Sequence, residues 1–188
     1  MEIVLASTSP RRQELLLQLG LAFRTVPSNF DETVPEPMAP AELVRHLALM
    51  KAREVLHRVP DALVIGADTV VVLDDDILGK PRDRAHAIAM LERLSGREHQ
   101  VMTGVALLRG ERTLVAHEVT TVRFRTLDRG QIERYVDSGH PMDKAGAYGI
   151  QGRAAAMISS ISGDYFTVVG LPLSRTAQML SDFGVDVL

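Results

Sequence analysis

A short apolar strand that turns directly into a leucine-rich helix is the feature that most constrains what this chain can fold into. Residues 2–7 predict a buried strand, and a helix is predicted from about Pro10 to Leu19. Pro10 suits the first position of a helix, Ser9 suits its N-cap, and Gly20 suits the position just beyond its end. A buried strand that feeds a helix is typical of folds in which helices cover a sheet.

The turn between this strand and this helix also gathers groups that bind anions. The first backbone N–H groups of a helix have no partner within the helix and lie at the positive end of its dipole. Ser7 adds a hydroxyl, and Arg11 and Arg12 add guanidinium groups whose forked donors match phosphate oxygens. Helix capping explains Ser9 and Pro10 but neither Ser7 nor the arginines, so an anion site is favoured over capping alone.

Predicted helices and strands alternate along the rest of the chain, and a hairpin among them excludes a purely parallel sheet. Further helices are expected near residues 40–59, 83–96, 128–138 and 172–183, and Asp83 is expected to cap the second of these. Further strands are expected at residues 22–26, 62–73, 77–79, 100–108, 114–124, 154–161 and 165–169. We therefore expect one domain of mixed α/β class over residues 1–188.

Composition limits the partners of the protein. The net charge of −3 argues against a broad nucleic-acid-binding face. Cysteine is absent, which excludes disulfides and thiolate metal sites and suits a reducing compartment. No apolar run reaches membrane-spanning length, so we expect a cytoplasmic protein. The six histidines lack the spacing of metal ligands and are interpreted as surface or core residues.

A lone carboxylate inside an apolar strand is the second functional signal. Asp68 lies within residues 63–72, which are otherwise almost entirely apolar. Burying an unpaired carboxylate is costly, so Asp68 must pair with another group, bind a metal or line an open cleft. Gly66 and Ala67 before it leave room for a ligand to approach the backbone. A purely structural Asp68 is equally compatible with this segment, but the nearby anion-binding turn favours a functional role.

Two lysines and a glycine-rich loop carry weaker signals. Lys51 falls within the apolar stripe of the predicted helix at 40–59, where it either extends to the edge or meets an anion. Lys80, between Gly79 and Pro81, is more often a simple exposed turn lysine. Residues 143–152 hold three glycines with Ala, Tyr and Ile between them, which indicates a loop packed against the protein rather than a flexible one.

These segments occur in an order that resembles the Maf family of nucleoside triphosphate pyrophosphatases, which is similar in fold to the inosine triphosphatases. The matching segments are residues 5–12, 65–71, 79–81, 94–96 with His99, 142–152, 163–165 and 169–172. The resemblance implies a mixed, largely antiparallel central sheet flanked by helices, two lobes with a cleft, and often a homodimer. It also implies a hydrolase that converts a nucleoside triphosphate to the monophosphate and pyrophosphate with Mg²⁺ or Mn²⁺.

The same resemblance implies roles for individual residues. Asp68 corresponds to the general base, or to a ligand of the metal that activates water, with Glu32 as its acidic partner. The phosphate contacts correspond to Ser7, Arg12, Lys51 and Lys80. The positions that select the substrate correspond to Arg11, Thr69 and Gln151. This last combination resembles the subgroup that acts on dTTP and UTP, including modified pyrimidine nucleotides.

Two other functions are compatible with the same residues. A non-catalytic, nucleotide-binding regulator of cell division or septum formation would use the same cationic groups. However, a pure triphosphate binder gains nothing from two carboxylates, Asp68 and Glu32, unless they hold a metal. A nucleotidyltransferase is less favoured, because the sequence contains no recognisable acceptor-binding segment.

Overall fold

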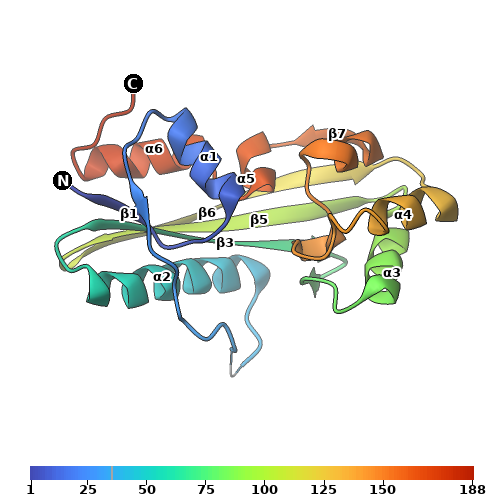
Figure 1. Ribbon diagram of the computed structural model, residues 1–188, viewed down its shortest axis with the longest axis horizontal. Helices are drawn as coiled ribbons and strands as arrows, with labels where there is room; N and C mark the ends of the chain where they lie inside the picture. Colours follow the sequence, from blue (N-terminus) through green and yellow to red (C-terminus); the bar gives the residue numbers. More distant parts are fainter. Residues whose placement is uncertain (35) are drawn as a thin grey trace. The chain divides into compact units, whose positions relative to one another are not determined.

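A mixed sheet forms the centre of the protein. In a computed structural model that describes residues 1–34 and 36–188, seven strands are ordered β2-β1-β3-β5-β6-β7, and β4 pairs with β3 (Figure 1). The strands are β1 Ile3–Leu5, β2 Arg24–Thr25, β3 Leu63–Leu73, β4 Asp76–Leu78, β5 Glu98–Arg109, β6 Arg112–Phe124 and β7 Ile158–Ser162. The helices are α1 Pro10–Gln18, α2 Pro40–Arg58, α3 Arg84–Leu94, α4 Arg129–Val136, α5 Tyr165–Val169 and α6 Leu173–Asp182, with 3₁₀ helices η1 Ala145–Ala147 and η2 Gly152–Met157.

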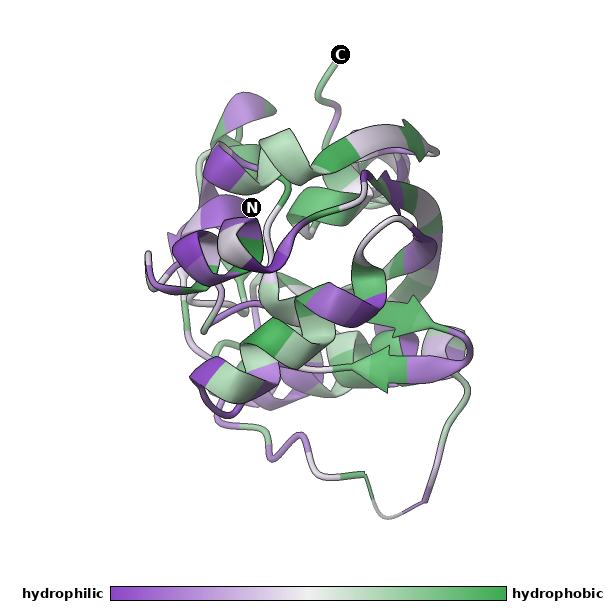
Figure 2. Cartoon of the chain, turned by 90° about the vertical axis from the view of Figure 1, so that its right-hand side faces the viewer, coloured by the Kyte–Doolittle hydropathy of each residue, from purple (hydrophilic) through white to green (hydrophobic). Residues whose placement is uncertain are grey.

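The sheet is largely antiparallel, as expected. β1 pairs in parallel with both β2 and β3, whereas β3 with β4 and β6 with β7 are antiparallel. β5 and β6 are sheet neighbours joined only by Gly110 and Glu111, the length of a tight hairpin. Figure 2 shows helices that carry green hydrophobic residues beside purple hydrophilic ones, as helices that cover a sheet require.

The chain divides into two compact units, and the division falls within β3, β5 and β6. Unit 1 comprises Met1–Asp68, Thr103–Glu118 and Gly170–Leu188. Unit 2 comprises Thr69–Met102 and Val119–Val169. Within the described residues, none of the helices combines the length and the hydrophobicity needed to cross a membrane.

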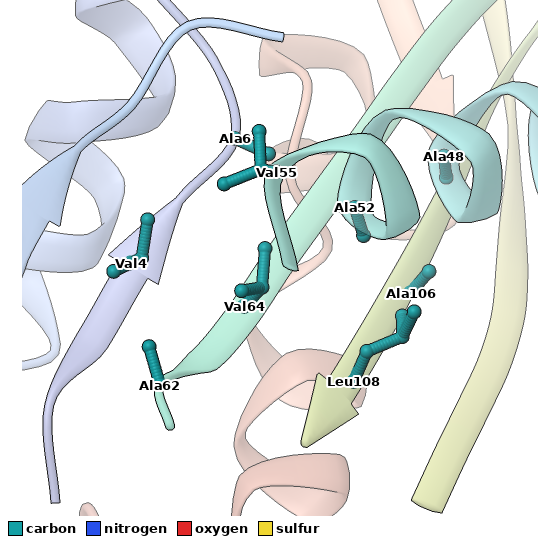
Figure 3. Packing of buried hydrophobic residues seen from close by; sticks show 9 residues of the cluster. All are labelled: Val4, Ala6, Ala48, Ala52, Val55, Ala62, Val64, Ala106 and Leu108. Carbon is teal, nitrogen blue, oxygen red and sulfur yellow. The ribbon is translucent and has the colours of Figure 1, made fainter. Parts of the chain in front are cut away.

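In unit 1, α2 covers one face of the strands, and α1 and α6 lie on the other face (Figure 1). One apolar cluster fills the space between α2 and the strands (Figure 3). Its buried side chains come from α2, from β1, β3 and β5, and from residues that adjoin these strands. Its members are Val4, Ala6, Ala48, Ala52, Val55, Ala62, Val64, Ala106 and Leu108. Most of them are small, which allows the helix backbone to lie close to the strands.

The close approach of α2 corrects one expectation from the sequence. A Cβ atom on Gly66 would lie 2.3 Å from the carbonyl oxygen of Ala48, and one on Gly104 would lie 2.2 Å from that of Val44. These distances are far shorter than any normal contact, so the glycines are required by the helix backbone itself. The space beside Gly66 is therefore occupied by α2 rather than left for a ligand.

Unit 2 contains α3, which packs against α4 and η1. Asp83 caps α3 as predicted, because its Oδ1 accepts a hydrogen bond from the backbone N–H of His86 at 2.7 Å. Asp128 caps α4 and forms a capping box with Gln131. These local caps fix where both helices begin.

The prediction of a strand at residues 165–169 is wrong, because this segment forms α5. Asp164 stabilises the helix start: its Oδ1 accepts from the backbone N–H of Phe166 at 3.0 Å, and its Oδ2 accepts from the Thr167 hydroxyl at 3.1 Å. This cap outweighs the strand preference of the β-branched residues that follow.

Two other predicted strands are shorter than expected. The strand predicted at residues 154–161 begins only at Ile158, because Gly152–Met157 form the 3₁₀ helix η2. The strand predicted at residues 22–26 is reduced to Arg24–Thr25, which pair with β1.

Candidate active site

Asp68 lies in the buried strand β3 and is paired with a lysine from α2. Side chains alternate along a strand, so Asp68 faces the same side as Val64 and Gly66, the side that α2 covers. Its Oδ1 accepts a hydrogen bond from Lys51 Nζ at 2.6 Å, and the side chains of Asp68 and Lys51 are only 11% and 12% exposed. This ion pair accounts for a carboxylate within an apolar strand.

A second carboxylate contacts the same lysine. Glu32 Oε1 lies 2.9 Å from Lys51 Nζ, and the Glu32 side chain is more than half exposed. The segment that carries Glu32 is attached to α2, because the backbone N–H of Asn29 donates to Glu54 Oε2 at 2.9 Å. Lys51 therefore holds two carboxylates from different parts of the chain, rather than simply extending to solvent.

The N-terminal turn contributes an arginine that the fold holds in place. Arg12 Nε donates a hydrogen bond to the carbonyl oxygen of Gly170 at 2.8 Å, and its Nη1 donates to Ser7 Oγ at 3.4 Å. Burial lowers the pKa of the Arg12 guanidinium, and the negative charges of Asp68 and Glu32 partly offset this effect. Arg12 thus experiences the charge of both carboxylates.

The expected capping of α1 is only partly correct. Pro10 is the first helical residue, as predicted, and Ser9 occupies the N-cap position. However, the Ser9 side chain makes no capping hydrogen bond in the described structure, and its backbone N–H donates to Ser7 Oγ at 3.1 Å. Ser9 is therefore the N-cap residue, as predicted, but the hydroxyl that organises the turn belongs to Ser7.

Unit 1 thus brings together five of the predicted site residues: Ser7, Arg12, Glu32, Lys51 and Asp68. Two of them are cations and two are carboxylates. Such a set can neutralise phosphate oxygens with its cations and keep acidic oxygens beside them.

The two carboxylates also fit a divalent cation that is shared with a bound phosphate. Glu32 and Asp68 converge on one position, since both contact Lys51 Nζ. Mg²⁺ typically takes one or two protein carboxylates when phosphate oxygens and waters complete its shell. Within residues 1–34 and 36–188, no group of three or more His, Cys, Asp or Glu side chains is arranged to hold a metal. A metal bound here would therefore take two carboxylates from the described residues and the rest of its ligands from phosphate and water.

In unit 2, the glycine-rich loop at 143–152 is packed down, as predicted. The backbone N–H of Gly146 donates to the carbonyl oxygen of Gly79 at 3.0 Å. A Cβ atom on Gly146 would lie 2.9 Å from the Val71 side chain, so only glycine fits against β3 here. These contacts place the loop beside the turn that carries Lys80.

The remaining predicted site residues differ in their exposure. Thr69 is half-buried and points to the same side of β3 as Val71, against which the glycine-rich loop packs. Lys80 and Gln151 are exposed, and Gln151 occupies the position just before η2. Thr69, Lys80 and Gln151 all belong to unit 2, whereas Arg11, on α1, is half-buried in unit 1.

Sequence reasoning missed a buried polar pair beneath this loop. His99 Nε2 and the Tyr148 hydroxyl oxygen lie 2.6 Å apart, and His99 is 3% exposed. Both rings pack edge-on against each other and against Phe124, with centroid distances from 4.8 to 5.4 Å. Burial lowers the pKa of His99 to about 4 and raises the pKa of Tyr148, so both groups are neutral near neutral pH.

The arrangement of the chain is also found in solved structures. It is similar to a HAM1 protein from Coxiella burnetii, with a TM-score of 0.55 and 18% identity over 97% of this chain and 99% of that one. It is also similar to the Staphylococcus aureus Ham1 protein, with a TM-score of 0.51 and 13% identity over 84% and 91% of the two chains. These similarities define the fold class alone, and they confirm the expected mixed α/β fold.

The family follows from sequence comparison. The family described as Maf-like protein matches residues 2–183, so this chain belongs to the Maf family. A dTTP/UTP pyrophosphatase from Symbiobacterium thermophilum is 62% identical over 186 residues, which cover 99% of this chain and 96% of that protein. A dTTP/UTP pyrophosphatase from Pelotomaculum thermopropionicum is 56% identical over 189 residues, which cover 100% and 99%.

Acidification is expected to destabilise the protein through His99. The unfolded chain takes up a proton at His99 near its ordinary pKa of 6.5, whereas burial holds the pKa of the folded histidine at about 4. Between these values the unfolded state binds more protons, so the contribution to stability is fully present above the higher value and falls as the pH drops. The difference in free energy of unfolding between wild type and His99→Gln should change by about 2 kcal/mol between about pH 7.5 and about pH 5.

Urea denaturation of both proteins at the two pH values checks this expectation. The wild type should lose more stability than His99→Gln as the pH falls. Parallel losses in the two proteins would contradict a buried, neutral His99.

Proposed function

We propose that the protein hydrolyses dTTP and UTP, and modified pyrimidine nucleotides, to the monophosphate and pyrophosphate. Support comes from the two near-full-length relatives that carry the name dTTP/UTP pyrophosphatase. The observation that carries the proposal is the buried Asp68 carboxylate, held by Lys51 and within the field of Arg12. This arrangement combines an acidic group with the positive charge that a triphosphate needs.

Lys51, Arg12, Ser7 and Lys80 would bind the phosphate oxygens. An ammonium group has three N–H donors, and in the described structure Lys51 directs two of them to Asp68 and Glu32. The third donor can bind a phosphate oxygen without breaking either contact. Arg12 adds a positive charge that its hydrogen bond to Gly170 keeps in place.

Hydrolysis of a phosphoanhydride needs positioning and charge neutralisation more than covalent catalysis. Asp68 would accept a proton from the attacking water, whose oxygen forms a bond to phosphorus. The bond from that phosphorus to the oxygen that bridges the α- and β-phosphates breaks, and its electron pair leaves with that oxygen. The departing group is pyrophosphate when water attacks the α-phosphorus and the nucleoside monophosphate when it attacks the β-phosphorus. A divalent cation, Mg²⁺ or Mn²⁺, would be held by Asp68 and Glu32 and would supply further neutralisation of phosphate charge.

The base would be selected by Gln151, Arg11 and Thr69. A primary amide offers a carbonyl acceptor next to an N–H donor, which matches the alternating donors and acceptors on the edge of uracil or thymine. Gln151 is exposed, so its amide is available to a ligand.

We further propose a cytoplasmic homodimer without a nucleic-acid partner. The absence of cysteine supports a reducing compartment, and the net charge of −3 argues against binding to nucleic acid. The dimer rests on the resemblance to the family alone.

Asp68→Asn is expected to abolish turnover, by about 10³-fold or more, while leaving the fold intact. The amide keeps the volume of the carboxylate and can still accept a hydrogen bond from Lys51, but it cannot accept the proton. Pyrophosphate release from dTTP, UTP and GTP with Mg²⁺ or Mn²⁺ measures the effect, and thermal melting checks the fold. Asp61→Asn, at an exposed aspartate of the same unit, is the control and should stay active.

Near-normal hydrolysis by Asp68→Asn would remove this residue from the mechanism. A wild-type protein that binds these nucleotides but releases no pyrophosphate would instead favour the non-catalytic regulator.

Gln151→Ala is expected to reduce kcat/KM for dTTP and UTP by about tenfold, since it removes hydrogen bonds to the base. GTP hydrolysis should change little. Kinetics with the three nucleotides provide the test, and Gln178→Ala, at an exposed glutamine of α6, is the matched control. An equal loss with all three nucleotides would assign Gln151 to folding or to phosphate binding.

A further inference from the structure

His99 and Tyr148 form a polar pair in a buried, apolar part of unit 2, and packing alone does not explain why polar side chains lie there. His99 is on β5, and Tyr148 belongs to the 143–152 loop, so this contact ties the loop to the sheet. Both side chains are buried, together with Phe124, which is 1% exposed. A polar pair in such apolar surroundings contributes little net stability compared with apolar residues of similar size.

Among the residues that the structure describes, the contact with Tyr148 is the hydrogen bond that the His99 ring makes. Its second ring nitrogen, Nδ1, is buried and has no hydrogen-bond partner among the described residues. A buried polar atom without a partner costs free energy, so the position of His99 carries a penalty. The compensating interaction is the one with the Tyr148 hydroxyl.

The loop next to Tyr148 has a backbone conformation that needs such an anchor. Ala147 has a φ of 61°, in the left-handed region that residues with a Cβ rarely adopt, and Gly146 before it has a φ of 67°. A non-glycine residue in this region costs about 1 kcal/mol or more. The contacts on either side, from Gly146 to Gly79 and from Tyr148 to His99, hold this strained turn in one conformation.

The anchored turn leads directly to the residue proposed to select the base. Ile150 is buried, with 7% of its surface exposed, and the next residue, Gln151, is exposed. Tyr148 and Ile150 point into the protein while Gln151 points out. The orientation of the Gln151 side chain therefore depends on where Tyr148 is fixed.

We propose that His99 is a positioning residue for substrate selection: through its hydrogen bond to Tyr148, it holds the 143–152 loop so that Gln151 is presented to a uracil or thymine base. The proposal rests on the proposed function, because it requires Gln151 to contact the base. It assigns no contact between His99 and the substrate.

Tyr148→Phe is the central test, because it removes only the hydroxyl and keeps the ring against Phe124. The preference for UTP over GTP, as a ratio of kcat/KM values, should fall about fivefold to tenfold, mainly through a higher KM for UTP. In a Gln151→Ala background, the same substitution should leave this ratio unchanged, because the residue through which it acts is gone.

Two variants of the histidine complete the design. His99→Gln introduces an amide that can pair with the tyrosine hydroxyl and should keep most of the preference for UTP, whereas His99→Leu should lose it.

Asp128→Ala serves as a control for a general loss of stability. It removes the cap of α4 in the same unit, and a lost cap costs about 1 kcal/mol. This control should melt earlier than the wild type but keep its preference for UTP.

Hydrogen–deuterium exchange provides a readout that does not depend on activity. Amides of residues 145–151 should exchange faster in Tyr148→Phe than in the wild type and should be unaffected in Asp128→Ala. Unchanged exchange in Tyr148→Phe would overturn the proposal. An equal loss of activity with UTP and GTP in this variant would also overturn it, as would an undiminished fall in the UTP/GTP ratio when Tyr148→Phe is made in the Gln151→Ala background. Faster exchange in Tyr148→Phe, together with a wild-type protein that does not hydrolyse UTP, would instead contradict the proposed function and leave the anchoring role supported.

Discussion

The ion pair between Lys51 and Asp68 is the interaction on which the rest of the site depends. A carboxylate in the middle of β3 is tolerated because an ammonium from α2 lies 2.6 Å away. The ammonium reaches it because α2 lies directly on the strand, over Gly66, where even a Cβ atom would collide with the helix backbone. The glycine, the small residues of the apolar cluster and the charged pair are therefore parts of one arrangement.

The same arrangement gives the site its chemistry. Lys51 also contacts Glu32, and Arg12 experiences the charge of both carboxylates. Two cations beside two carboxylates form a nearly neutral set that is suited to a strongly negative ligand with its own metal ion. In unit 2, the loop that carries Gln151, one of the residues proposed to select the base, is fixed by backbone and side-chain contacts.

Much of this could be predicted from the sequence where the signals are local. The strand–turn–helix at the N-terminus, the cap at Asp83 and the need for Asp68 to have a partner follow from neighbouring residues. The partner of Asp68 could not be identified, because Lys51 has the appearance of an ordinary helix-edge lysine. From the sequence, Gly66 is expected to leave room for a ligand. The helix α2 fills that room instead, and no pattern around Gly66 indicates this because α2 is a separate segment. The pairing of His99 with Tyr148 joins residues 49 positions apart, which no local pattern encodes.

The most direct test of this account is the energetic coupling between Lys51 and Asp68, measured by urea denaturation of Lys51→Met, Asp68→Asn and the double variant. Lys51→Met alone should cost about 3 kcal/mol, since it leaves a buried carboxylate without its cation. In the Asp68→Asn background the same change should cost about 1 kcal/mol, which gives a coupling of about 2 kcal/mol. An equal cost of Lys51→Met in both backgrounds would contradict the claim that this lysine holds Asp68 in place.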